Sequence, residues 1–279
     1  MHSTVSTRKQ YHIACGPGDL AEYLLVPGDP DRVPRIAKFW DSAREVSSHR
    51  EFRGYSGQYK GVPISALSSG IGPACMAIAV NESSNIGVNT FVRVGSAGAI
   101  RKDIDCGDLV ISSAAVRLDC TSNCYVMPEY PAAASYEVLL ALIEAAESLN
   151  ICNYHVGVTA TTSDFYAGQN RPTAKTCSSN MENLLPTLQK AGVLSFDMET
   201  ATLFTLAGLY GLRACSICAV YANRCTDKFE PGEGEENAIR IANEAVKIFN
   251  EWDSVKRRKK RRWLFPSLMH TPKPKMVRS

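Results

Sequence analysis

Apolar residues follow two different spacings along this chain. Short runs rich in β-branched residues are typical of strands, whereas longer stretches repeat apolar positions three and four apart, as at Ile239, Ala242, Val246 and Phe249. Strands are predicted at residues 23–26, 62–67, 90–94, 108–116, 155–161 and 214–222. Helices are predicted at residues 32–39, 75–86, 136–149, 198–210 and 236–252. This alternation predicts an α/β fold with a largely parallel sheet.

Residues 1–252 are expected to form one domain, because the apolar periodicity ends near Trp252. Seven consecutive basic residues follow at 256–262, and the end of the chain contains prolines. We expect 253–279 to be a flexible, solvated tail, although a nuclear localisation signal, an acidic partner or an anionic membrane could use such a run. This run contributes +7 to a formal net charge of +3, so the rest of the chain is net acidic. The composition therefore argues against a protein that coats nucleic acid, except through the tail.

Cysteine usage and hydropathy predict a cytoplasmic protein without a membrane span. Ten cysteines are scattered through apolar stretches, and the pair Cys215 and Cys218 falls in a predicted strand. Residues three apart on a strand face opposite sides, which favours buried free thiols over a metal or redox site. The first residues contain no apolar core of a secretory signal, and no run of 18 apolar residues occurs.

Two predicted strands end in a combination of glycine and arginine. Gly28 follows the first strand and Arg32 opens the next helix, which suits an anion, although a tight turn explains the pattern equally well. Arg93 lies inside an apolar strand, where an unpaired guanidinium is costly, and Ser96 follows in a glycine-rich turn. We expect an anion there, with a structural carboxylate as the alternative for Arg93.

A third segment follows the strand that ends at residue 161. It contains Phe165, which could stack on a flat ring, and then Gln169 and Arg171, whose amide and guanidinium could read a ring edge with the pattern C=O, N–H, C=O. By spacing alone, an ordinary polar loop is the better interpretation.

Acidic and basic groups flank two further elements. Asp197 and Glu199 open a predicted helix, where capping explains Asp197 well, while Glu199 could hold two sugar hydroxyls. Arg224 ends a strand and precedes the acidic, glycine-rich stretch 227–236, which could be a mobile flap or a plain surface loop.

Taken together, these segments resemble the nucleoside phosphorylase-I family, and most closely its uridine phosphorylase type. The matching stretches appear in family order and span roughly residues 10–252: 26–33, 48–52, 70–72, 93–100, 165–171 and 197–199. The resemblance implies a single α/β domain with a mixed, partly barrel-like central sheet flanked by helices. It also implies a homo-oligomer, a dimer at least and a hexamer as an option, with sites shared between subunits.

The resemblance assigns roles to individual residues. The implied phosphate ligands are Gly28, Arg32, Arg93, Ser96 and, from a neighbouring subunit, Arg50. The implied nucleoside ligands are His12 from the neighbour, Phe165, Gln169, Arg171, Asp197, Met198, Glu199 and Arg224. Among these, Arg93, Arg171 and Glu199 are expected to be catalytic.

The implied reaction is phosphorolysis of uridine, with deoxyuridine as a further candidate, to uracil and ribose 1-phosphate in pyrimidine salvage. Phosphate is a co-substrate, and no cofactor is expected. No metal is expected either, because Cys75 stands where a hydroxyl ligand would accompany Glu51. A purine nucleoside phosphorylase is the alternative, but purine-type relatives have an aspartate near the position of Asn223. Ala97 and Asp197 depart from the usual pattern, so a catalytically weak nucleoside-binding homologue is a third hypothesis.

Overall fold

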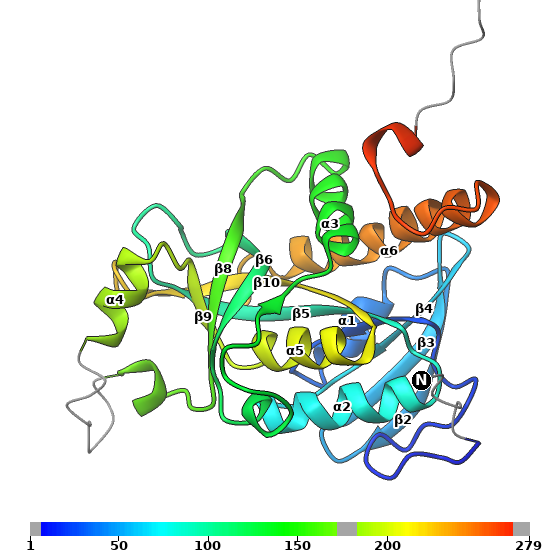
Figure 1. The fold of residues 1–279 in the computed structure, drawn as a ribbon, viewed down its shortest axis with the longest axis horizontal. Helices are drawn as coiled ribbons and strands as arrows, with labels where there is room; N and C mark the ends of the chain where they lie inside the picture. Colours follow the sequence, from blue (N-terminus) through cyan, green and yellow to red (C-terminus); the bar gives the residue numbers. More distant parts are fainter. Residues whose placement is uncertain (1–6, 172–182, 270–279) are drawn as a thin grey trace, which may run out of the picture.

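The computed structural model describes residues 7–171 and 183–269, and its order of elements is that of an α/β protein (Figure 1). The strands are β1 (Tyr23–Val26), β2 (Ser42–His49), β3 (Phe52–Tyr59), β4 (Val62–Leu67), β5 (Thr90–Ala99), β6 (Leu109–Leu118), β7 (Ala132–Ala133), β8 (Tyr154–Thr162), β9 (Ser195–Asp197), β10 (Arg213–Asn223) and β11 (Lys228–Phe229). The α-helices are α1 (Arg32–Ala37), α2 (Pro73–Asn85), α3 (Tyr136–Ser148), α4 (Leu184–Lys190), α5 (Thr200–Tyr210) and α6 (Glu235–Arg258). Short 3-10 helices are η1 (Ser122–Cys124), η2 (Ala167–Gln169) and η4 (Pro266–Leu268). Within the described residues, no helix is long and apolar enough to cross a bilayer.

The central sheet is mixed and partly closed. Its strand order is β11-β10-β6-β8-β9-β5-β1-β4-β3-β2, and an additional pairing between β10 and β5 closes five of these strands into a barrel-like ring. Strand β5 runs parallel to β1 and β10 but antiparallel to β9. The mixed, partly barrel-like sheet expected from the resemblance is therefore confirmed.

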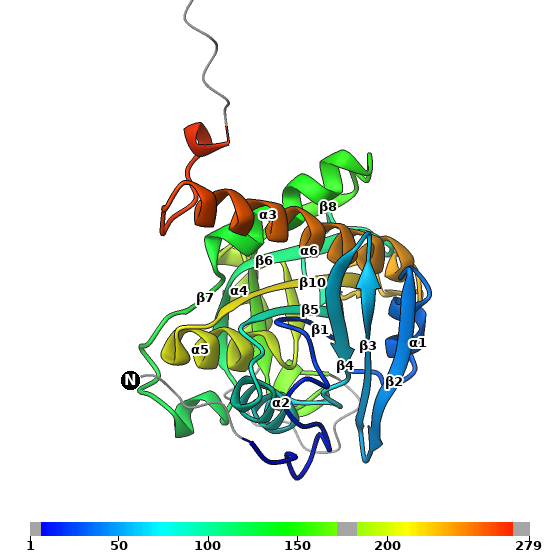
Figure 2. The same cartoon turned by 90° about the vertical axis from the view of Figure 1, so that its right-hand side faces the viewer.

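Helices cover both faces of this sheet (Figure 2). On one side, α3 and α6 pack over a core that contains Phe249 and Trp252, and on the other side α2 and α5 pack over a core that contains Met76 and Phe204. Strand β5 lies between the two layers and has a fully buried Phe91. This burial from two sides explains its nearly continuous apolar sequence.

The strongly apolar elements match their predicted positions. Strands β1 and β4 have the predicted bounds, whereas β5 continues to Ala99, five residues beyond its predicted end. The glycine-rich segment expected as a turn after residue 94 is therefore strand, because its small residues pair with β10 on one side and β9 on the other. The β2–β3 hairpin was not predicted, since its partly exposed residues lack an apolar signal.

Helical structure and core packing continue beyond the expected domain boundary at Trp252. Helix α6 continues to Arg258, and Leu264 and Leu268 are buried in the core beside it. In this last part of α6, the buried Asp253 and Lys256 form an ion pair at 2.9 Å. Of the predicted tail, only residues 270–279 lie outside the described residues.

The cysteines follow the prediction in part. Cys215 lies in the core on one face of β10, while Cys218 lies on the other face beside Gly95, so the two thiols do point in opposite directions. Among the cysteines in the described residues, three are exposed rather than buried: Cys120, Cys124 and Cys152.

Candidate active site

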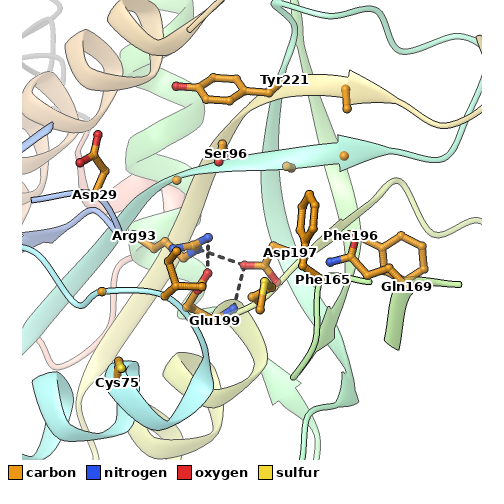
Figure 3. A pocket seen from close by; sticks show the side chains of 18 of the residues that line it. Asp29, Cys75, Arg93, Ser96, Phe165, Gln169, Phe196, Asp197, Glu199 and Tyr221 are labelled. Atoms are coloured by element: carbon orange, nitrogen blue, oxygen red, sulfur yellow. Dashed lines mark hydrogen bonds and ion pairs between the residues drawn. The ribbon is translucent and has the colours of Figure 1, made fainter. Parts of the chain in front are cut away.

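A cavity of about 970 Å³ opens where β1, β5 and β10 end and β9 passes into α5 (Figure 3). Ligand sites in α/β sheets form at such strand ends. Ten residues predicted from the sequence line it: Gly28, Arg32, Arg93, Ser96, Phe165, Gln169, Arg171, Asp197, Met198 and Glu199. Three predicted residues do not line it: His12, Arg50 and Arg224.

Arg93 is the buried cation of this cavity. Its Nε donates to Asp197 Oδ2 at 3.0 Å, and its Nη2 pairs with Glu199 Oε2 at 2.6 Å. Burial lowers the pKa of Arg93, but the two carboxylates outweigh that effect and hold it above the ordinary value. Its Nη1 is buried and has no hydrogen-bond partner among the described residues. An unsatisfied charged donor in a cavity is costly unless an acceptor occupies the space beside it.

Gly95 makes the position of Arg93 possible. The two residues lie on the same face of β5, and a Cβ at Gly95 would lie 2.7 Å from Cζ and Nη2 of Arg93. It would also lie 2.8 Å from Sγ of Cys218, which is opposite Gly95 on β10. The guanidinium therefore folds back over backbone that has no side chain.

Asp197 is an internal anchor rather than an available ligand. Its Oδ2 accepts from Arg93 and from the backbone N–H and hydroxyl of Thr200, and its Oδ1 accepts from the Thr161 hydroxyl at 2.6 Å. Both oxygens are occupied by the chain itself, so Asp197 positions Arg93 and Thr200 in this arrangement, and its expected contact with a nucleoside stays a prediction. The capping interpretation of Asp197 fits, since Thr200 begins α5.

Glu199 lines the cavity next to Arg93. Its Oε1 accepts from the backbone N–H of Gly72 at 2.6 Å, and its Oε2 meets Arg93. Burial raises the pKa of Glu199, and the Arg93 guanidinium opposes that rise. Paired in this way, the carboxylate has lone pairs left for ligand hydroxyls.

Arg32 is held by three partners. Its Nε donates to Glu235 at 2.8 Å, its Nη1 to the Val94 carbonyl at 3.0 Å and its Nη2 to the Tyr221 hydroxyl at 3.1 Å. Each terminal nitrogen carries a second hydrogen, so Arg32 can still donate into the cavity that it lines. Neither Glu235 nor Tyr221 was predicted, because nothing in their local sequence marks a partner this far along the chain.

A second group of side chains lines the wall opposite Arg93. The Arg171 guanidinium lies over the Phe165 ring, with Cζ 3.9 Å from the ring centroid, and Arg171 Nη2 donates to Gln169 Oε1 at 3.4 Å. Burial and the nearby Arg224 lower the pKa of Arg171. Its Nε is buried without a partner among the described residues. The arrangement places a stacking ring, an amide and a guanidinium around one space.

Arg224 supports this wall from behind. It donates to the backbone carbonyl oxygens of Gln169 and Asn170 at 3.0 and 3.2 Å and does not line the cavity. In this arrangement Arg224 positions η2, and direct contact with a base, the role that the resemblance implied, stays a prediction. Asn170 adopts the left-handed conformation, with φ of 51°, which makes the turn that Arg224 stabilises.

His12 and Arg50 lie together outside the cavity. His12 Nδ1 contacts Glu82 at 2.6 Å, the His12 carbonyl meets His49 Nδ1 at 2.8 Å, and the exposed Arg50 lies over the Tyr11 ring. Within one chain these side chains complete no site. They form a separate surface, which we call the His12–Arg50 surface.

The sequence assigned no phosphate-binding or nucleoside-binding role to several further residues that line the cavity. They are Asp29, Pro30, Glu51, Gly70, Ile71, Cys75, Tyr166, Phe196, Tyr221, Ala222 and Phe229. Glu51 Oε1 lies 3.5 Å from the Cys75 thiol, and no cluster of three potential metal ligands occurs in the described parts of the chain. The exposed Ile71 and Phe229 provide apolar side chains at the mouth.

Comparison with known proteins agrees with this geometry. Residues 22–251 match the model of the phosphorylase superfamily. The chain is 55% identical to a uridine phosphorylase of Thermococcus kodakarensis over 93% of both chains, and 37% identical to that of Escherichia coli over 85% of this chain and 96% of the relative. It is also 36% identical to a guanosine phosphorylase of Halorubrum lacusprofundi over 85% of this chain and 98% of the relative. The chain therefore belongs to the phosphorylase superfamily.

Proposed function

We propose that this protein is a uridine phosphorylase, which transfers the ribosyl group of uridine to inorganic phosphate. The observation that carries the proposal is the buried Nη1 of Arg93, which has no partner among the described residues, on a side chain that lines a cavity together with Phe165, Gln169 and Arg171. Relatives named as uridine phosphorylases at 55% and 37% identity support the choice of substrate.

The phosphate is held on the arginine side of the cavity. Arg93 Nη1 and the remaining hydrogens of Arg32 donate to it, with the Ser96 hydroxyl and the bare backbone of Gly28 beside them. Glu199 accepts hydrogen bonds from ribose hydroxyls and keeps the sugar next to the anion. Held in this way, a phosphate oxygen attacks C1′ while the bond from C1′ to the base nitrogen breaks. Positioning supplies much of the rate enhancement.

The departing uracil carries negative charge on its carbonyl oxygens. Donors from Gln169 and Arg171 meet that charge, and the partly buried site strengthens the interaction. The burial that lowers the pKa of Arg171 makes an anionic partner favourable there. Phe165 stacks on the ring once the guanidinium moves from its face to the ring edge.

Asn223 favours a pyrimidine over a purine. Its amide nitrogen donates to the carbonyls of Arg101 and Ile104, and its oxygen accepts from the backbone of Cys225 and Thr226. Asn223 makes four internal hydrogen bonds, and its amide is not acidic. It therefore does not protonate a purine leaving group. A purine nucleoside phosphorylase remains the second candidate because of the guanosine phosphorylase relative.

A panel of nucleosides tests the proposal. We expect phosphate-dependent cleavage of uridine, with formation of ribose 1-phosphate, to be much faster than cleavage of inosine or guanosine. Faster cleavage of a purine nucleoside would contradict the choice of base. Cleavage without phosphate would contradict phosphorolysis, and uridine binding without turnover would favour a silent nucleoside-binding protein.

The proposal also covers the oligomeric state of the protein and its place in the cell. We infer a cytoplasmic homo-oligomer in pyrimidine salvage, a dimer at least, in which the His12–Arg50 surface of one subunit completes the cavity of its neighbour. Its support is that these two side chains lie outside the cavity of their own chain.

A further inference from the structure

The end of the chain carries a surface that the proposed reaction does not use. Six consecutive exposed basic residues, 257–262, are followed by Trp263, Leu264 and Phe265, and the described part ends at Met269. We call residues 257–269 the basic–aromatic segment. It lies beyond residue 251, where the match to the superfamily ends.

This segment is fixed on the body of the protein. The Leu264 backbone N–H donates to the Tyr136 hydroxyl at 3.1 Å and to Glu137 at 3.0 Å, and Leu264 and Leu268 are buried. Lys259 donates to the Leu268 carbonyl. Figure 1 shows the segment in red, turning back after α6. Its anchored positions therefore decide which neighbouring side chains face outward.

Three of the exposed side chains in the segment are apolar. Trp263, Phe265 and Met269 are 58%, 42% and 41% exposed, on either side of the buried leucines. Arg262 lies over the Trp263 ring at 4.8 Å. Exposed aromatic and aliphatic side chains held in place, rather than folded inward, indicate a surface that is covered in use.

The basic side chains have little internal compensation. Within the described chain, none of the six forms a salt bridge with a carboxylate, whereas Lys256, directly before them, pairs with Glu137 and Asp253. The change from paired to unpaired cations at one position along α6 leaves a dense local positive charge. Such a charge attracts a polyanionic surface.

We propose that the basic–aromatic segment binds the surface of an anionic phospholipid membrane. Clustered lysines and arginines are attracted by acidic headgroups, and tryptophan and phenylalanine enter the boundary between headgroups and acyl chains. A bilayer surface thus accounts for both halves of the segment. A nucleic acid would use the cations but gives no role to the exposed methionine.

Vesicle flotation of the full chain tests this. We expect binding to vesicles of equal parts phosphatidylcholine and phosphatidylserine, none to phosphatidylcholine alone, and release when ionic strength rises from about 0.1 M to about 1 M, which shortens the Debye length from about 10 Å to about 3 Å. The variant R258Q/R261Q/R262Q is expected to bind about a hundredfold more weakly, at about fivefold per charge. W263A/F265A is expected to bind at least about tenfold more weakly at unchanged charge.

A matched control removes the same charge elsewhere. K38Q/R44Q/K102Q changes three exposed basic residues outside the segment and is expected to bind as the parent chain does. Thermal unfolding verifies that each variant is folded. Equal binding to neutral and anionic vesicles, equal loss in the control, or capture of a single-stranded oligonucleotide without vesicle binding would each overturn the proposal. A change in the oligomeric mass of W263A/F265A without any change in its vesicle binding would also overturn the proposal.

Discussion

At the scale of single residues, Arg93 combines two requirements that usually conflict. A buried guanidinium needs carboxylate partners, and a ligand-binding guanidinium needs a free donor. Asp197 and Glu199 take Nε and Nη2, while Nη1 is left without a partner among the described residues. The two partners predicted for Arg93 were a bound anion and a structural carboxylate. The carboxylates account for Nε and Nη2, and Nη1 is left for an anion.

Replacing Arg93 by lysine separates these two parts. The ammonium of R93K can still pair with Asp197 and Glu199, so the fold is retained, but the planar fork that supplies Nη1 is lost. We expect kcat/KM for phosphorolysis to fall about a thousandfold, as for loss of one fixed donor to a transition state. R213K is the control, because Arg213 pairs with Asp253 away from the cavity. Near-parental activity of R93K would make Arg93 purely structural.

Gly95 offers a second test of the same geometry. In G95A the new methyl would overlap the Arg93 guanidinium, so we expect a higher KM for phosphate and a stability loss of about 1–3 kcal/mol from overpacking. Steady-state kinetics and chemical denaturation measure the two effects. G16A is the matched control, because a Cβ there meets nothing closer than 3.7 Å. If G95A matched G16A in both measurements, the packing of Arg93 against bare backbone would have no consequence.

Residue types and their order predicted most of the residues that line the cavity. They did not predict which of these side chains form hydrogen bonds with one another. Asp197 and Arg224 were both expected to touch the nucleoside, whereas one anchors Arg93 and the other supports η2. Which donor satisfies which acceptor depends on contacts between residues far apart in sequence. Arg93 and Asp197, for example, are 104 positions apart and meet because β9 pairs with β5.

At the scale of elements, prediction succeeded where burial left an apolar signal. Strands β1 and β4 are largely buried and have the predicted bounds. The β2–β3 hairpin is half exposed, so its composition did not distinguish it from loop. The end of α6 was not predicted, because Lys256 belongs to a run of basic residues that is typical of a solvated segment. Its side chain is instead buried between Glu137 and Asp253.

Lys256 is buried and the next residue, Arg257, is exposed, so the two positions are expected to contribute differently to stability. K256M removes the cation that Glu137 and Asp253 share, at 2.5 and 2.9 Å. Asp253 keeps Arg213 as a partner, whereas the buried Glu137 is left without a cation among the described residues. We expect the free energy of unfolding to fall by about 3–5 kcal/mol in chemical denaturation. R257M, one residue further along the helix and exposed, is expected to change it by less than about 0.5 kcal/mol. If K256M and R257M had similar free energies of unfolding, the residues after Trp252 would contribute little to the folded domain, as the sequence predicted.

At the scale of the whole molecule, the residues predicted for the site lie on two separate surfaces of the chain. Phosphate-side and base-side residues share one cavity, while His12 and Arg50 lie elsewhere on the same chain. Arg50 has φ of 56°, a left-handed turn between β2 and β3 that presents its side chain at the protein surface. In the proposed dimer, a second copy would bring the His12–Arg50 surface of one subunit to the cavity of the other.

Mixing two inactive variants tests whether subunits share sites. R50A and R93K each disable every site of their own homo-oligomer if Arg50 acts across the interface. In a mixed dimer, one site then receives both substitutions and the other receives neither, so co-refolding equal amounts is expected to restore about a quarter of the parental activity. R93K mixed with E199Q is the control, because both residues line the cavity of the same chain and every mixed site keeps one defect. Recovery in the control as well, or none in the first mixture, would place Arg50 outside the neighbour's site.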